Sequence, residues 1–222
     1  NLSYAWWLIG GGYTSIYRLD YANDSNSLSP KGYAVPANVQ RAFAVQSDTH
    51  GYFGGGPHPA GVSTIQRIEF ANDTGTALIR GPLSAGRYAI GGAGNTNYGY
   101  AFGGYIPFAP GPSAGSWVDR LDYSNDTATT LAKGPLSTVR GQISAVGTND
   151  YGYAGAGSYN QYTGIDRMDY SNDSATPVQK TSLTTDGDAQ TAYKGSTGTG
   201  SYGYWAGGGA GSSNITTTDR LD

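Results

Sequence analysis

The sequence predicts an all-β protein in which one short unit of strands recurs along the chain. Three observations predict this fold. Glycine and tyrosine dominate the composition, with 36 glycines and 19 tyrosines among 222 residues. One charged phrase recurs with a period of about 50 residues, and each period holds four strand-like segments. No window has the i, i+3, i+4, i+7 apolar spacing of a packed helix, and glycine supplies the positive φ angles that tight turns require.

The repeated phrase is clearest at 118–140, where it reads VDRLDYSNDTATTLAKGPLSTVR. Its first arginine recurs at Arg18, Arg67, Arg120, Arg167 and Arg220. A second landmark, an aromatic run that ends in glycines, precedes the phrase, as in GYFGGG from Gly51 and GYAFGG from Gly99. Two landmarks in a fixed order predict one domain over 1–222, with repeats at approximately 1–38, 39–84, 85–137, 138–184 and 185–222.

Four strands can be assigned within one period. The first follows an arginine, as in RAFAVQ, RYAIGG and RGQISAVG, and the second is the aromatic run YGYAFGG. The third is WVDRLDYS, in which Val118 and Arg120 share one face while Asp119 and Leu121 share the other. The fourth, TATTLAKG, is entered through an Asn-Asp turn and left through Gly-Pro. Four strands in a period of this length are typical of a β-propeller blade.

The landmarks resemble kelch repeats: glycine doublets end the second strand, a spaced aromatic follows, and Pro-Leu-Ser precedes the next arginine. Small apolar residues such as Leu78 and Leu131 stand where the kelch fourth strand usually carries tryptophan. We therefore expect a kelch-like β-propeller of four-stranded blades. By these assignments the chain runs from the second strand of one blade to the third strand of the fifth, about 4.5 blades, and is expected to be a fragment of a larger propeller.

An arginine and an acidic residue two positions later recur in every copy. Because the two share one strand face, we expect them to pair with each other or with a neighbouring blade. A catalytic group is needed once, whereas this pair recurs, so a structural role is favoured over acid–base chemistry. The pairs are Arg18 and Asp20, Arg67 and Glu69, Arg120 and Asp122, Arg167 and Asp169, and Arg220 and Asp222.

The composition excludes several kinds of site. The chain has no cysteine, which excludes disulfides, thiolate ligands and the cysteine–tyrosine cofactor of the kelch-type copper radical oxidase. His50 and His58 are too few for a zinc site and are expected to be loop residues. The turn that holds Asp122, Asn125 and Asp126 lacks the spacing and closing glutamate of an EF-hand. We expect no cofactor and no bound metal.

Charge and hydropathy restrict the partners. The net charge is −3 and no basic run is present, so nucleic-acid binding is not expected. No apolar run is long enough to span a bilayer, so membrane insertion is not expected either. The glycine doublets are not followed by a helix or by Lys-Ser/Thr, which excludes a phosphate-binding loop.

Variation among the copies is concentrated between the second and third strands, as in GGGPHPAGVSTI and GGYIPFAPGPSAGSW. This loop is expected on the face that also carries the links between blades. Variable loops on a rigid scaffold usually carry recognition, and aromatic and amide groups stack on sugars or pack on proteins. The alternative left open is that the aromatics only cover the blade edges. The candidate binding residues are Tyr105, Phe108, Trp117, Tyr159, Asn160 and Tyr162.

The wording of the repeat is also similar to kelch-like virion structural and tail-fibre-like proteins of marine cyanophages. This resemblance implies a non-enzymatic component of the virion, in a fibre, tail or capsid surface, with other virion proteins and host-surface glycans as partners and homo-oligomerisation left open. The alternative is a secreted or cell-surface lectin-like propeller. An enzyme on a propeller scaffold is the third reading, and it is disfavoured because the non-repeating charged residues Asp150, Asp186, Asp188 and Lys194 are scattered.

Overall fold

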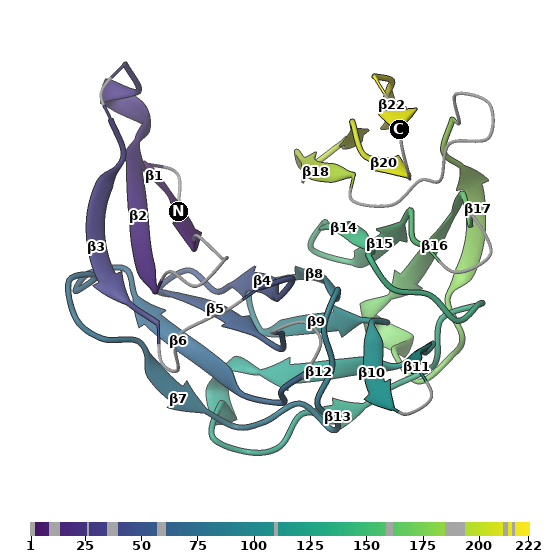
Figure 1. Cartoon of the computed structure of the whole chain (residues 1–222), viewed down its shortest axis with the longest axis horizontal. Helices are drawn as coiled ribbons and strands as arrows, with labels where there is room; N and C mark the ends of the chain where they lie inside the picture. Colours follow the sequence, from purple (N-terminus) through teal and green to yellow (C-terminus); the bar gives the residue numbers. More distant parts are fainter. Residues whose placement is uncertain are drawn as a thin grey trace.

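The computed structural model describes residues 3–8, 14–25, 27–34, 40–56, 61–108, 111–158, 162–184, 194–210, 213–214 and 216–222. Five small antiparallel sheets lie around a common axis and form a five-bladed β-propeller (Figure 1). The predicted all-β propeller is therefore confirmed. In Figure 1 the first and last sheets lie at the two ends of the arc.

Each blade is an antiparallel sheet whose strands follow one another from the axis outward. The first blade holds β1 (Tyr4–Leu8), β2 (Ser15–Asp20) and β3 (Ser29–Tyr33). The second holds β4 (Phe43–Gln46), β5 (His50–Gly54), β6 (Ile65–Glu69) and β7 (Leu78–Arg80). The third holds β8 (Gly91–Gly94), β9 (Tyr98–Phe102), β12 (Val118–Asp122) and β13 (Leu131–Ala132).

The fourth blade holds β14 (Ser144–Gly147), β15 (Tyr151–Gly155), β16 (Gly164–Asp169) and β17 (Val178–Ser182). The fifth holds β18 (Gly195–Gly198), β19 (Gly203–Ala206) and β22 (Thr218–Leu221). The described strands thus give three in the first and fifth sheets and four in each of the others, as the sequence assignments predict. The strand register shows that β1 corresponds to the second strand of a blade. Trp6 of β1 faces Arg18, as Tyr100 of the second strand β9 faces Arg120.

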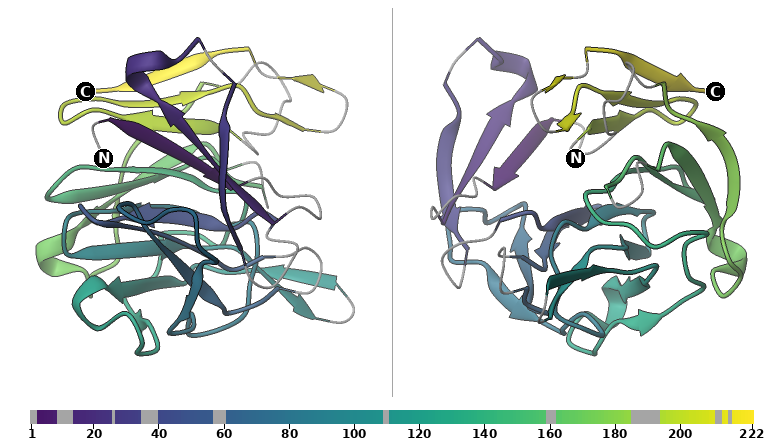
Figure 2. Two further views of the ribbon diagram at one scale, coloured as in Figure 1. Left: turned by 90° about the vertical axis from the view of Figure 1, so that its left-hand side faces the viewer. Right: turned by 45° about the vertical axis from the view of Figure 1, so that its right-hand side comes forward.

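Two hairpins and three short helical turns complete the described structure. The hairpins are β10 (Tyr105–Phe108) with β11 (Gly111–Ala114), and β20 (Gly209–Ala210) with β21 (Ser213–Asn214). Figure 2 shows in its left panel that both project from the same side of the disc. The 3-10 turns η1 (Tyr21–Asn23), η2 (Tyr123–Asn125) and η3 (Tyr170–Asn172) follow the third strands of their blades.

The core lies between blades rather than within any one of them. Phe43, Val45 and Tyr52 of the second blade are buried in one cluster with Ala101 and Leu121 of the third. Comparable clusters join the first blade to the second, the third to the fourth and the fourth to the fifth. Burial of apolar side chains therefore requires neighbouring blades to be present, which is the usual logic of a repeat architecture.

The inner strands β4, β8, β14 and β18 lie next to one another around the axis. Just before them, Arg41, Ala89 and Gln142 adopt left-handed φ angles of 55°, 59° and 58°. The Ala89 amide donates to the Arg41 carbonyl at 2.7 Å, and the Gln142 amide donates to the Ala89 carbonyl at 2.7 Å. Arg41 is two residues from its strand, whereas Arg87 and Arg140 are four from theirs. The first strand follows an arginine in these three blades, as expected, but Arg41 takes the position of Ala89 and not that of Arg87 and Arg140.

Candidate functional site

The most deeply buried charges are arginine–aspartate pairs inside single blades. The Arg140 and Asp166 side chains are both 0% exposed and lie 3.0 Å apart. Ser137 donates to the Asp166 carboxylate through its amide at 2.9 Å and through its hydroxyl at 2.7 Å. Arg87 and Asp119 form the same arrangement in the third blade, with N–O 2.9 Å. Burial lowers the pKa of both arginines, while the adjacent carboxylates act in the opposite direction.

A second set of charges joins neighbouring blades. Asp126, in the Asn-Asp turn of the third blade, accepts hydrogen bonds from two groups of the second blade: the Tyr52 hydroxyl at 3.0 Å and Arg67 Nη1 at 2.7 Å. Arg80 Nε of the same blade lies 3.3 Å from the Asp126 carboxylate. Asp126 is only 8% exposed. We call this arrangement, one turn aspartate with the third-strand arginine of the preceding blade, the interblade joint.

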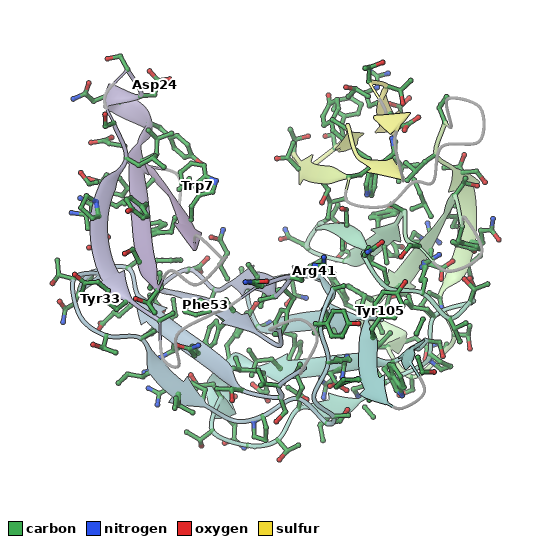
Figure 3. The ribbon with its side chains drawn as sticks, in the orientation of Figure 1. Trp7, Asp24, Tyr33, Arg41, Phe53 and Tyr105 are labelled. Atoms are coloured by element: carbon green, nitrogen blue, oxygen red, sulfur yellow. The ribbon has the colours of Figure 1, made fainter. Side chains whose placement is uncertain are left out.

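The interblade joint recurs at two more boundaries, between the third and fourth blades and between the first and second. Asp173 of the fourth blade receives the Tyr100 hydroxyl at 3.0 Å, Arg120 Nη1 at 2.8 Å and Lys133 Nζ at 3.0 Å from the third. Asp73 of the second blade receives Trp6 Nε1 at 2.8 Å and Arg18 Nη1 at 3.1 Å from the first. The equivalent Asp24 lies exposed at the free end of the first blade (Figure 3).

The joint explains how the repeated arginines and acids are used. The arginine reaches the next blade, and the acid two positions later does different work: Asp20, Asp122 and Asp169 each accept the amide two residues on and cap a 3-10 turn. Glu69 accepts through its backbone carbonyl from Asn72. The Arg167 guanidinium lies 4.4 Å above the Tyr151 ring. Pairing within the motif is seen at Arg220 and Asp222, which are 2.8 Å apart and exposed.

Aromatic rings stack beside each joint. The ring after the third strand packs on a second-strand ring of the preceding blade, as Tyr123 does on Tyr52 at 4.9 Å and Tyr170 on Tyr100 at 4.7 Å. Burial and the Asp126 carboxylate raise the pKa of Tyr52 to about 12. Burial likewise raises the pKa of Tyr100, Tyr123 and Tyr170. These phenols are therefore held in their neutral form by the fold.

Sequence reasoning missed the aspartates that do most of this work. Asp73, Asp126 and Asp173 were assigned to turn chemistry alone, although their side chains bind the neighbouring blade. A signal was available in the sequence. The turn after the third strand has aspartate at the same position in four copies, at Asp24, Asp73, Asp126 and Asp173, although a turn would also accept asparagine or glycine there. Asp119, the buried partner of Arg87, was placed on the correct strand but given no partner.

The structure gives three of the candidate binding aromatics partners inside the molecule. Tyr105, on β10, bonds the Ser158 hydroxyl at 2.5 Å and stacks on Tyr88 (Figure 3). Trp117 and Tyr162 lie over the buried arginines, with the Arg87 guanidinium 6.0 Å and the Arg140 guanidinium 4.3 Å from the ring centres. Both rings are partly exposed, so packing accounts for their positions and the binding role stays a prediction.

The other candidates are less fully placed. Phe108 is the last residue of β10, where it pairs with Gly111. Tyr159, Asn160 and His58 lie outside the described residues. The face predicted to carry the variable loops is the one from which β10–β11 and β20–β21 project (Figure 2).

Of the two histidines, the structure describes His50 alone. His50 Nδ1 lies 2.8 Å from the Thr49 hydroxyl in the β4–β5 turn. Within the described ranges, no three histidine, aspartate or glutamate side chains gather as metal ligands. Lys194, one of the non-repeating charges, pairs with Asp219 at 3.2 Å, and Asp186 and Asp188 lie outside the described residues.

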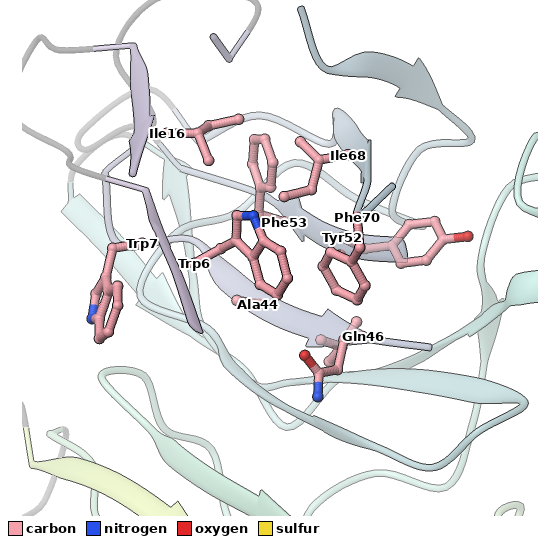
Figure 4. Close-up of a pocket in the computed structure, with 11 residues that line it drawn as sticks. Trp6, Trp7, Ile16, Ala44, Gln46, Tyr52, Phe53, Ile68 and Phe70 are labelled. Atoms are coloured by element: carbon pink, nitrogen blue, oxygen red, sulfur yellow. The ribbon is translucent and has the colours of Figure 1, made fainter. Parts of the chain in front are cut away.

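A largely apolar pocket of about 220 Å³ lies beside β1, between the first and second blades (Figure 4). Trp6, Phe53 and Phe70 contribute to its wall. At the next boundary the inner strand fills the corresponding space, because Val45 of β4 lies against Gly99. The first blade has no such inner strand among the described residues, so the pocket beside Gly51 is open there and Trp7 is 43% exposed.

None of the described helical turns has the length and apolar character needed to cross a membrane. No protein-family model matches the chain, and no curated protein matches it significantly.

Proposed function

We propose that the chain is a non-enzymatic structural component of a phage virion, and that it works as a rigid disc holding another virion protein or a host-surface glycan. The supporting observation is how the repeated charges are used. Arg67 and Arg120 are joined to the turn aspartates of the next blade, and Arg87 and Arg140 to aspartates of their own blade. These charges stabilise the ring, and a stiff ring is a suitable base for binding loops.

The proposed contact surface is the face with the β10–β11 and β20–β21 hairpins. These hairpins break the repeat, since the corresponding loops of the other blades differ from them in length and sequence. The β10–β11 hairpin is anchored at its base by Tyr105, which exchanges backbone hydrogen bonds with Tyr88 at 3.1 and 2.8 Å. The resemblance of the repeat to kelch-like proteins of marine cyanophages supports a place in the virion.

Immunogold labelling of purified cyanophage particles that encode this sequence tests the location. We expect antibodies raised against the chain to label intact particles at a fixed position, in a fibre, tail or capsid surface. Label in the culture medium or on the cell surface, with none on particles, would instead favour a secreted lectin-like propeller and contradict the proposal.

A hairpin replacement tests the contact face. Residues 106–113 are replaced by a two-residue Asn-Gly turn, which keeps Tyr105 and its bonds to the disc. We expect this variant to fold with an unchanged circular dichroism spectrum but to lose adsorption to virion subunits or to host cells. Leu131→Ser is the matched control, because Leu131 is 54% exposed on the outer strand, away from that face. Equal adsorption by both variants would argue against the hairpin face.

A further inference from the structure

A polar pocket of about 490 Å³ lies at the boundary between the second and third blades. It is formed by the β4–β5 turn, the β8–β9 turn and the start of η2, through residues such as Asp48, His50, Asn97, Tyr98 and Asp122. These turns join first to second strands, so the pocket is on the face opposite the hairpins. Its volume is within the range of about 300–1,000 Å³ that small-molecule sites occupy.

Two residues of the second blade distinguish this pocket: His50, which departs from the repeat, and Ser47, which differs from Asn95 of the third blade. His50 stands where the other blades carry tyrosine, at Tyr4, Tyr98, Tyr151 and Tyr202. In those blades the tyrosine ring lies under the third-strand arginine, with Arg120 4.4 Å from the Tyr98 ring centre. The smaller imidazole leaves room beside Arg67 that a phenol ring would fill.

At the start of this turn the second blade carries Ser47, the third carries Asn95, and the fourth and fifth carry Thr148 and Thr199. At the boundary between the third and fourth blades, Asn95 Nδ2 donates to the Asn149 carbonyl at 3.2 Å and ties the two turns together. Ser47 is too short for this bridge, and its hydroxyl accepts the His50 amide of its own turn at 3.1 Å. The two turns around the pocket are therefore not tied by this bond.

Several polar groups around the pocket keep bonding capacity. Asp48 is exposed, and its carboxylate has no partner within the described part of the chain. Asp122 uses Oδ1 for the Ser124 amide and hydroxyl, which leaves Oδ2. His50 uses Nδ1 with Thr49, so Nε2 is available. Tyr123, which is partly exposed, also lines the pocket.

We propose that this pocket binds a neutral saccharide. Two carboxylates, Asp48 and Asp122, disfavour an anion, and among the described residues no three histidine or acidic side chains gather to hold a metal ion. Sugar hydroxyls both donate and accept, so a neutral polyol can satisfy carboxylate, amide and imidazole groups together. The C–H face of a pyranose ring packs on an aromatic ring such as that of Tyr123. The site is on the opposite face from the hairpins and does not rest on the proposed virion function.

Giving the second blade the residues of the third blade tests the proposal. The double variant Ser47→Asn/His50→Tyr gives the second blade the residues of the third at both positions. The probes are the methyl glycosides of glucose, galactose, mannose, fucose and N-acetylglucosamine, with glucuronic acid as the anionic comparison, measured by saturation-transfer NMR and calorimetry. We expect at least one neutral glycoside to bind the native chain and to bind the double variant at least about tenfold more weakly, with glucuronic acid weaker than glucose.

The control is Thr148→Asn/Tyr151→Phe, conservative changes at the equivalent turn of the fourth blade, outside the pocket. It is expected to bind like the native chain. Urea unfolding of all three proteins shows that each is folded. The proposal is overturned if no neutral glycoside binds the native chain, if the double variant Ser47→Asn/His50→Tyr binds as tightly as the native chain, or if the control loses binding equally. Loss of hairpin-dependent adsorption leaves this result unaffected, so the two proposals fail separately.

Discussion

Replacing Asp166 by asparagine removes a carboxylate that lies wholly inside the fourth blade. Its partner Arg140 is also 0% exposed and keeps neutral acceptors, such as the Ala154 carbonyl at 3.1 Å. The change therefore leaves a guanidinium buried without a counter-charge. Removing one partner of a buried pair costs about 3–5 kcal/mol. That loss is a large part of the roughly 5–15 kcal/mol that holds a typical domain folded.

The chain itself supplies the design of the compensating variant. In the second blade the aspartate position holds the neutral and buried Gln66, which is 2% exposed, and the residue four positions before the inner strand is Val39 rather than arginine. Charge is thus absent from both positions together. Arg140→Val/Asp166→Asn imitates this state. We expect the double variant to lose clearly less unfolding free energy than the sum of the losses of the two single variants, Arg140→Val and Asp166→Asn.

Urea unfolding of the native chain, the two single variants and the double variant measures the coupling. We expect Asp166→Asn to lower the unfolding free energy by about 3–5 kcal/mol and the coupling energy to be about 2–3 kcal/mol. Leu131→Ala, on the exposed outer strand, is the control and is expected to change it by less than about 0.5 kcal/mol. Additive losses, or a loss below about 1 kcal/mol for Asp166→Asn, would refute the reasoning.

Three further predictions concern contacts between neighbouring blades. Asp126→Asn removes the charge that Arg67 and Arg80 share, and because both arginines are partly exposed we expect a loss of about 1–3 kcal/mol in urea unfolding; no change would show that the joint is not stabilising. Gly134→Ala would place a Cβ against the backbone carbonyl of Ala175, whereas a Cβ on Gly75 meets nothing nearby, so differential scanning calorimetry should show a lower Tm for the first alone. The pKa of Tyr52 is raised from 10.0 to about 12, so the neutral phenol is favoured by folding: its contribution is complete below pH 10 and is lost as the pH rises toward 12. Phenolate absorbance should therefore increase in a step that coincides with loss of the folded circular dichroism signal, and a smooth titration of all tyrosines without unfolding would contradict this.

The fold could be predicted from the sequence because each repeat contains landmarks that identify its strands. The arginine of the third strand fixes that strand, and the glycines after the aromatic run fix the second, so sheet order follows from sequence order. The three strands of the first blade were also predictable, because its first strand-like segment resembles the second strand β9 in sequence. The different position of Arg41 was not predictable, because the sequence does not show whether an arginine lies two or four residues before the first strand.

The joints were harder to predict than the strands. Arg67 and Glu69 lie on the same face of their strand, so an ion pair between them was the simplest expectation. Arg67 instead bonds Asp126 of the next blade. Which group an arginine reaches depends on how closely neighbouring blades pack, and single-strand periodicity contains no such information. The polar pocket was hidden for a different reason: His50 is unusual only when its position is compared with Tyr98 and Tyr151 in the correct register.

The binding aromatics show a third limit. Trp117 and Tyr162 were selected as loop aromatics, and each lies over a buried arginine. When the repeats are aligned, Trp117 of the third blade corresponds to Gly164 of the fourth, and Gly115 corresponds to Tyr162. A Cβ at Gly115 would meet Trp117, and a Cβ at Gly164 would meet Tyr162. Such a compensating exchange becomes visible only when both chain positions are known to share one space.

The claim on which the account depends is that the repeated phrase is laid around a common axis. Leu78, Leu131 and Val178 are equivalent outer-strand residues, 54%, 54% and 57% exposed, and the chain has no native cysteine to interfere with labelling. Nitroxide labels on pairs of cysteines at these positions give three distances by double electron–electron resonance. We predict that the 78–178 distance is about 1.6–1.8 times the mean neighbour distance, as in rings of roughly five to seven blades. A ratio near 2, as in a straight stack of sheets, would contradict the account.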